Sequence, residues 1–410
     1  MISPSTDRLF YRDALASREL RALLAAQLIS VTGQCIAAVA LTVRVYRATA
    51  SPLLASLTFA LSFLPYLIGG SLLSGLVDRF RPRTLVVTCD SGSALLMAGI
   101  AWPGSPLPLL FALLLASGML SSTASGARAA LVRATAPGDA YVPARSLMRI
   151  AAQLAQLGGN AAAGALLVVL SPSGALLASA AAFALSATTI RLRVSDHEIV
   201  GEQSSAPLVR DSWRGAREIL ALPELRRLLL VGWFTPMFIV APEALAAPYV
   251  ARHHGAPAFV GWWLVALPIG MIAGDFLGVR LLSARQQRRL VAPALAVGFV
   301  PYLAFALSPP IPVAMGLLVL SGLSAFSSLG LDARVRDAAP PQLFARTMTV
   351  STGGLMALQG IGFALAGAIG QGVGPAAAIA IAGACGLAGT TGLMGGELRA
   401  PLRVREEAVR

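Results

Sequence analysis

Residues Leu107–Ser125 read LPLLFALLLASGMLSSTAS, nineteen positions without a charged side chain. The apolar residues follow one another and do not alternate with polar ones, which excludes a strand with one wet face. A helix needs about 20 such residues to cross a hydrocarbon layer roughly 30 Å thick. Backbone polar groups must be paired inside the segment in lipid. The stretch therefore predicts a membrane-spanning α-helix.

Eleven further runs of this kind lie on either side of it. They are Leu20–Val43, Leu53–Val77, Thr84–Trp102, Ile150–Leu170, Gly174–Ile190, Leu228–Val250, Phe259–Leu282, Leu290–Leu307, Ile311–Leu331, Met348–Gly370 and Ala376–Leu393. The 410 residues are 56% hydrophobic with a mean hydropathy of +0.73, and 12% are charged, against about 25% in soluble domains. The sequence predicts an all-α membrane protein with twelve transmembrane helices.

The basic residues are placed by topology. All 32 are Arg, and only Arg44, Arg47 and Arg252 lie between spans on one side of the predicted membrane. Because positive charge gathers on the cytoplasmic side, both termini are expected there. The net charge of +13 then needs no nucleic acid partner. The absence of Lys excludes a P-loop ATPase and Schiff-base chemistry.

A polar stretch at 191–227 divides the chain. It predicts an N-terminal six-helix bundle at 1–190, a cytoplasmic loop at 191–227, a second bundle at 228–396 and a cytoplasmic tail at 397–410. An offset of 203 residues aligns similar residues at equivalent points of the two halves: Tyr46 with Tyr249, Pro65 with Pro268, Gly75 with Gly278, and Pro137 with Pro340. The two bundles are therefore expected to be pseudo-symmetric repeats.

The segment Ser74–Leu85, SGLVDRFRPRTL, lies between the second and third spans. It resembles the signature cytoplasmic loop of the major facilitator superfamily, Gly-x-Leu-Ala-Asp-Arg-x-Gly-Arg-Arg/Lys. The matching positions are Leu76, Asp78, Arg79 and Arg83, while Ser74, Arg81 and Pro82 depart from the pattern. The resemblance implies a latch that holds the halves together, with Asp78 binding Arg128. The alternative is a simple basic turn.

Three other segments resemble the drug and macrolide-efflux branch of that superfamily: 126–132 (GARAALV), 241–249 (APEALAAPY) and 359–363 (QGIGF). This resemblance implies a monomeric proton antiporter of the bacterial cytoplasmic (inner) membrane, which exports small molecules through a cavity lined by the first, fourth, seventh and tenth helices. Asp90 fits the branch as well. Ser93 stands where the branch commonly has Arg, which leaves the partner of Asp90 open.

Three acidic residues fall inside predicted spans: Glu243, Asp275 and Asp90. A charge at the centre of a span costs about 2.5–3.5 kcal/mol on insertion scales, so such residues usually face a cavity or a partner. A desolvated carboxyl group can also exchange a proton near neutral pH. Glu243, between Pro242 and Pro248, is the leading candidate for proton coupling. The alternative for each is a structural carboxyl paired with a neighbour.

We therefore expect a secondary active transporter, with lipid and protons as its partners and a lipophilic or amphipathic solute as its cargo. Neither a nucleophile–base pair nor a cluster of metal ligands is visible, so we expect no enzyme, no metal and no cofactor. The substrate-binding residues cannot be assigned from the sequence. Three alternatives remain: a facilitator that imports a metabolite, a transporter-like sensor without flux, and a polytopic membrane enzyme.

Overall fold

The computed structural model describes residues 17–72, 80–102, 104–136, 141–196, 217, 219–339 and 344–399, and within them it contains helices and no strand. Ten helical segments in this part of the chain have the length and hydropathy of membrane spans. Two shorter apolar helices, Pro52–Ser62 and Val291–Leu307, lie within or beside the predicted second and ninth spans. The all-α membrane fold is thus confirmed with ten candidate spans among the described residues, and the count of twelve stays a prediction.

The chain divides into two compact units, the first made of Met1–Val209 and Ala246–Val265 and the second of Arg210–Leu245 and Ala266–Arg410. The segment Ala246–Val265 belongs by sequence to the predicted second bundle, yet it packs within the first unit. Most of the predicted loop at 191–227 lies outside the described residues, and the division at that loop stays a prediction.

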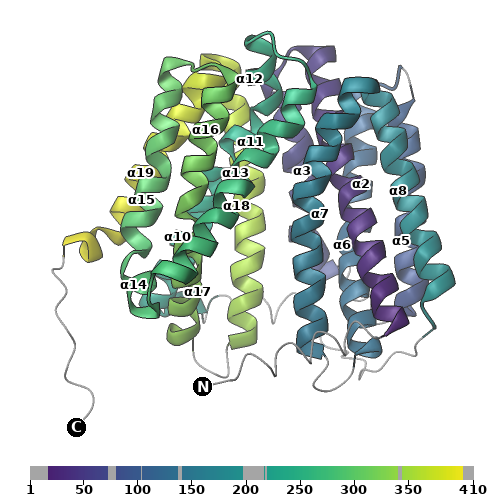
Figure 1. Ribbon diagram of the computed structural model, residues 1–410, viewed down its shortest axis with the longest axis horizontal. Helices are drawn as coiled ribbons and strands as arrows, with labels where there is room; N and C mark the ends of the chain where they lie inside the picture. Colours follow the sequence, from purple (N-terminus) through teal and green to yellow (C-terminus); the bar gives the residue numbers. More distant parts are fainter. Residues whose placement is uncertain are drawn as a thin grey trace. The chain divides into compact units, whose positions relative to one another are not determined.

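Long, uninterrupted helices form the first unit (Figure 1). They are α2 (Arg18–Thr49), α3 (Pro52–Leu72), α5 (Pro82–Ala101), α6 (Leu107–Thr135), α7 (Tyr141–Val169) and α8 (Pro172–Arg193). Helix α2 packs against α3, α7 and α8, while α5 packs against α6 and α8. Leu23, Val86, Leu131 and Ile190 meet in the core of this unit and are fully buried.

Two serines fix the register of α2 against α8. The hydroxyl of Ser179 donates to the Gly33 carbonyl at 2.7 Å, and that of Ser186 lies 3.2 Å from the Ala26 carbonyl. The two contacts are seven residues apart on both helices and run in opposite directions, so the helices are antiparallel. Hydroxyl-to-carbonyl bonds and small residues are the usual means of joining helices in lipid.

Helix α2 continues past the predicted end of its span at Val43. Arg44 and Arg47, expected in a loop, therefore lie on its last turns. The Arg44 guanidinium donates to the carbonyls of Ile100 and Trp102, the latter at 2.8 Å. These are carbonyl groups at the end of α5, which have no partner within their own helix. Arg44 thus has a structural role as the C-terminal cap of α5.

Helices of the second unit are more often interrupted. They are α10 (Pro223–Ile239), α11 (Ala241–Ala244), α14 (Ala284–Arg289), α15 (Val291–Leu303), η2 (Ala304–Leu307), α16 (Ile311–Gly322), η3 (Leu323–Ala325), α17 (Phe326–Ala338), α18 (Phe344–Val373) and α19 (Pro375–Arg399). Helix α13 (Ala258–Leu281) begins in the first unit and belongs to the second from Ala266 onward. The predicted seventh span comprises α10, α11 and α12 (Ala246–Arg252), and the tenth comprises α16, η3 and α17. The core of this unit contains Leu228, Val291 and Leu331.

Three glycines spaced four residues apart on α13 allow a close crossing with the tenth span. A Cβ at Gly270 would overlap the Val319 carbonyl, and one at Gly274 the Leu323 carbonyl. A Cβ at Gly278 would overlap the Cβ of Phe326. This is the small-xxx-small spacing of tightly packed membrane helices. The 3₁₀ turn η3 begins at Leu323, one of the residues against which α13 packs.

Many large apolar side chains face outward. Leu95, Val168 and Leu192 are at least 70% exposed, and Leu307 is 86% exposed. Exposed apolar surface on this scale would be unfavourable in water. It is the surface expected of helices whose outer faces contact lipid.

Candidate functional site

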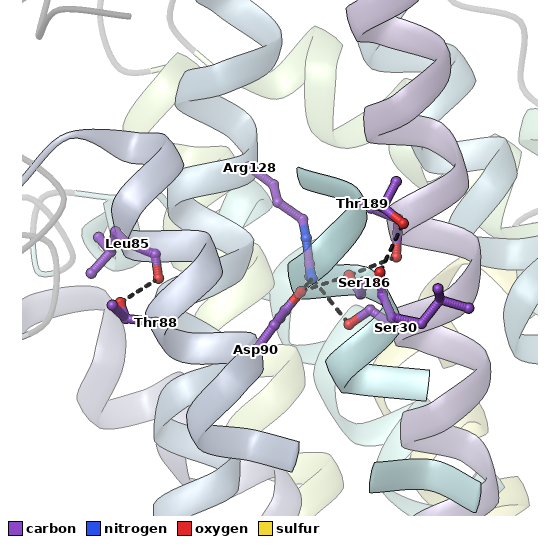
Figure 2. A network of polar contacts seen from close by, with 9 residues as sticks. Ser30, Leu85, Thr88, Asp90, Arg128, Ser186 and Thr189 are labelled. Atoms are coloured by element: carbon purple, nitrogen blue, oxygen red, sulfur yellow. Dashed lines mark hydrogen bonds and ion pairs between the residues drawn. The ribbon is translucent and has the colours of Figure 1, made fainter. Parts of the chain in front are cut away.

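Four helices of the first unit bring polar side chains together in an otherwise apolar core. Asp90 comes from α5, Arg128 from α6, Ser30 from α2 and Ser186 from α8. Figure 2 shows the Asp90 and Arg128 side chains pointing toward each other, with Ser30 and Ser186 beside them. Asp90 is 2% exposed and Arg128 7%. The two charges are therefore almost fully removed from solvent.

Arg128 satisfies the Asp90 carboxylate with one nitrogen. Its Nη2 donates to Oδ1 at 2.8 Å, to Oδ2 at 2.6 Å, and to the Ser30 hydroxyl at 3.0 Å. The Nε of Arg128 is buried and has no hydrogen-bond partner among the described residues. Charge-assisted bonds of this length are among the strongest in proteins. Arg128 is the partner of Asp90 that the sequence left open.

Ser186 connects the ion pair to α2. Its hydroxyl lies 2.6 Å from Asp90 Oδ2 and 3.2 Å from the Ala26 carbonyl. A hydroxyl has one hydrogen to donate, and the carbonyl and the ionised carboxylate can only accept. The shorter contact assigns the Ser186 hydrogen to Asp90 Oδ2, so Ser186 supports the ion pair from α8.

Arginines of the predicted latch bind the end of α8. Arg83 Nη2 donates to the Arg191 carbonyl at 2.5 Å, and Arg81 forms an ion pair with Asp196 at 2.6 Å. Asp78 and Arg79 lie outside the described residues. The predicted bond between Asp78 and Arg128 therefore lies outside the described residues and stays a prediction. Among the described residues, Arg128 binds Asp90.

Glu243 lies where the seventh span is broken, in the short helix α11 between α10 and α12. Of the four residues of α11, Ala241, Pro242 and Ala244 are buried, and Glu243 is partly exposed. No described residue donates a hydrogen bond to its carboxyl group. Pro242 lacks the N–H that would continue the helix, which explains the break after Ile239. Glu243 thus lies on an irregular backbone, with no ion pair or hydrogen bond to its carboxyl group among the described residues.

Tyr302 of α15 stabilises the broken span. Its hydroxyl donates to the Ile239 carbonyl at 2.9 Å, and its side chain is fully buried. Ile239 is the last residue of α10, so this carbonyl is one that a helix end leaves without a regular partner. Sequence reasoning missed this contact. A Tyr within an apolar run was the only available signal, since a buried hydroxyl must find a partner.

Asp275 lies on α13 beside the glycine crossing. It is partly exposed, but its Oδ1 is buried without a hydrogen-bond partner among the described residues. Asp275 and Glu243 both belong to the second unit, whereas Asp90 belongs to the first. Of the three carboxyl groups selected from the sequence, Asp90 alone has a described ion-pair partner.

The exporter-like segment at 359–363 lies on α18 where α18 crosses α10. A Cβ at Gly362 would overlap the Met237 carbonyl, and Phe363 is fully buried. Trp233 of α10 donates to the Ser351 carbonyl of α18 at 2.9 Å. This segment therefore packs α18 against the helix that leads to Glu243.

Known transporters resemble the chain in sequence and fold. It is 26% identical over 316 residues to the multidrug efflux pump Tap of Mycobacterium bovis and Mycobacterium tuberculosis. The alignment covers 73% of this chain and 74% of the efflux pump. A bacterial homologue of the human lysosomal transporter Spinster, solved inward-facing and unoccupied, has a TM-score of 0.66 at 15% identity and covers 93% of this chain and 94% of its own.

The nucleoside transporter NupG has a TM-score of 0.68 at 14% identity and covers 93% of this chain and all of its own. At these identities the solved structures show the shared fold alone. The sequence profile of the family matches residues 23–245, more than half of the chain, and it spans α2 to α11 with both Asp90 and Glu243. The helical architecture and this match lead to one conclusion: the chain belongs to the Major Facilitator Superfamily.

Proposed function

We propose that this chain is a proton-coupled exporter of lipophilic or amphipathic small molecules, which works by alternating access in the bacterial inner membrane. Membership of a transporter superfamily and similarity to a multidrug efflux pump support export of a small molecule. The largely apolar helices suit a lipophilic cargo. The observation that carries the proposal is Glu243, a carboxyl without a hydrogen-bond donor among the described residues, in a broken membrane helix.

Proton coupling requires a group that is ionised in one state and neutral in another. Asp90 is bound to Arg128 in a buried ion pair, which favours a positioning role within α2, α5, α6 and α8. Glu243 has no ion-pair partner among the described residues, and it lies in the irregular segment of the seventh span. Protonation would remove the charge from the segment between Ile239 and Leu245, and deprotonation would restore it. We assign the coupling role to Glu243, with Asp275 as the second candidate.

Transport by the full chain in proteoliposomes tests the proposal. A lipophilic dye is expected to accumulate when the imposed pH gradient favours exchange with protons, and accumulation should stop when a protonophore collapses the gradient. Glu243→Gln should abolish the dependence on the gradient but retain downhill dye flux. Glu224→Gln, an exposed acid in the first turn of the same helix, is the matched control and should behave as the unmodified protein.

Each failure has a different meaning. Gradient-independent accumulation by the unmodified chain would contradict proton coupling. Normal coupling in Glu243→Gln would remove Glu243 from the mechanism and turn attention to Asp275→Asn. Inward-only flux in vesicles of known orientation would favour the importer over the exporter, and no flux of any solute would favour a sensor.

A further inference from the structure

A groove of about 700 Å³ opens between the start of α2 and the end of α8. Three arginines line it: Arg18 and Arg21 on α2, and Arg193 on α8. The remaining lining consists of alanine, leucine and threonine side chains, among them Leu185 and Leu192. Among the described residues, the wall of the groove contains no acidic side chain. The lining residues recur at intervals of three and four on both helices, so each helix presents one face to the groove.

The register of the two helices places the charges at one end of the groove. The Ser195 N–H donates to Glu19 Oε1 at 3.2 Å, and this contact continues the antiparallel series of Ser186 with Ala26. Arg193 is therefore level with the first turn of α2, where Arg18 lies. From Arg18 to Ala25 the groove extends about 10 Å along α2 at 1.5 Å per residue. It is basic at the helix ends and apolar farther along the spans.

The three guanidinium groups are not neutralised within the described residues. None forms an ion pair there, and all three side chains are exposed. The neighbouring acids have other contacts, since Glu19 accepts from the Ser195 N–H and Asp196 binds Arg81. Thr188 and Thr189 donate their hydroxyls to carbonyls of their own helix at 2.8 and 2.7 Å. Recognition of a ligand in the groove thus depends on the arginines.

We propose that this groove binds an anionic phospholipid, with its phosphodiester on Arg18, Arg21 and Arg193 and an acyl chain against the apolar wall. The arginines supply the positive charge that pairs with the negative phosphodiester. Leu185 and Leu192 are 54% and 73% exposed, which suits contact with an acyl chain and not with a soluble anion. Basic pockets between helix ends at the cytoplasmic face are the kind of site that binds anionic headgroups.

Retention of lipid by the purified full chain tests this site. Detergent-solubilised protein is equilibrated with equal amounts of phosphatidylglycerol and phosphatidylcholine, and the lipids that stay bound are counted by native mass spectrometry. The variant with Arg18→Gln, Arg21→Gln and Arg193→Gln should retain phosphatidylglycerol at least tenfold less, with phosphatidylcholine unchanged. The corresponding Arg→Lys variant, which keeps the charges, should retain most of the binding.

The control removes equal charge elsewhere. Arg47→Gln, Arg252→Gln and Arg289→Gln change three exposed arginines outside the groove and should leave retention unchanged. Arg21→Gln alone should give an intermediate loss and serves if the triple variant does not fold. Equal loss in the control would show a nonspecific charge effect and overturn the proposal. Displacement of the lipid by millimolar inorganic phosphate would reassign the groove to a soluble anion and also overturn it.

Discussion

A carboxylate in the interior of a membrane protein is stable when a second group compensates its charge. Asp90 has this compensation from Arg128 and Ser186, with bonds of 2.6 Å to each. The acid could be selected from the sequence because it interrupts an apolar run. Its partner could not, because Arg128 lies 38 residues away and was counted among the cytoplasmic arginines. Only the packing of α5 against α6 brings the two together.

The buried pair predicts a large effect when one partner is removed. Arg128→Met leaves Asp90 as an uncompensated buried charge and should destabilise the protein by about 3–5 kcal/mol. Combining it with Asp90→Asn should restore much of the loss. The measurement is the thermal unfolding midpoint in detergent.

The exposed ion pair between Arg81 and Asp196 supplies the comparison. Arg81→Gln should cost about 0–1 kcal/mol, because water screens this pair. Similar losses in Arg128→Met and Arg81→Gln would contradict the account of the buried network.

Ser186 should influence Asp90 while Ser179 should not. Both serines contact carbonyls of α2, but Ser186 alone also contacts the carboxylate. Ser186→Ala removes a hydrogen bond to a charged group and should lower stability by about 1.5–3 kcal/mol, whereas Ser179→Ala should cost about 1 kcal/mol. Equal shifts of the thermal unfolding midpoint in detergent for the two variants would show that the contact of Ser186 with the carboxylate adds no stability.

Helices and their order followed closely from the apolar runs, because in lipid a continuous apolar stretch has no alternative to the helix. The sequence predicted one continuous seventh span, and its break beside Pro242 is explained by the N–H that proline lacks. The 3₁₀ turn at Leu323–Ala325 was not predicted either, since no proline lies within it. Its position coincides with the crossing of α13, where Leu323 meets Gly274. Such a departure depends on a neighbouring helix and is invisible in the segment's own sequence.

The crossing of α13 with the tenth span predicts a paired result. Gly274→Ala would drive a methyl group into the Leu323 backbone and should cost about 1–3 kcal/mol. Gly316→Ala, on α16 with open space around its Cβ position, should be neutral or stabilising by up to about 1 kcal/mol. Thermal unfolding in detergent measures both. Equal effects would mean that the helices can separate at no cost.

At the scale of the whole molecule, hydropathy and arginine placement predicted a polytopic helical protein, and the superfamily was predicted from a short loop motif. Both predictions are confirmed. The sequence could not show that Ala246–Val265 packs with the first unit, because this depends on contacts of α12 with α2 and α3. Gly164 of α7, which closely contacts Gly261 within the same unit, is a second case.

The orientation of the chain stays a prediction with a direct test. Cys35, Cys89 and Cys385 are first replaced by Ser or Ala. A single cysteine at His254 should then react with a membrane-impermeant maleimide in intact cells, and one at Ser283 only in inverted vesicles. The reverse pattern would place the arginine-rich side outside the cell and contradict the assigned topology.

The two units also differ in how bending is distributed along their spans. Spans such as α2, α6 and α8 are single rods, whereas the seventh and tenth spans of the chain consist of shorter pieces. A continuous helix resists bending along its whole length, whereas a broken helix bends where its backbone hydrogen bonds are interrupted. Glu243 lies between two such joints, at Val240 and Leu245. If Glu243 gains and loses a charge, as the proposed coupling requires, that change takes place between two interruptions of the helix.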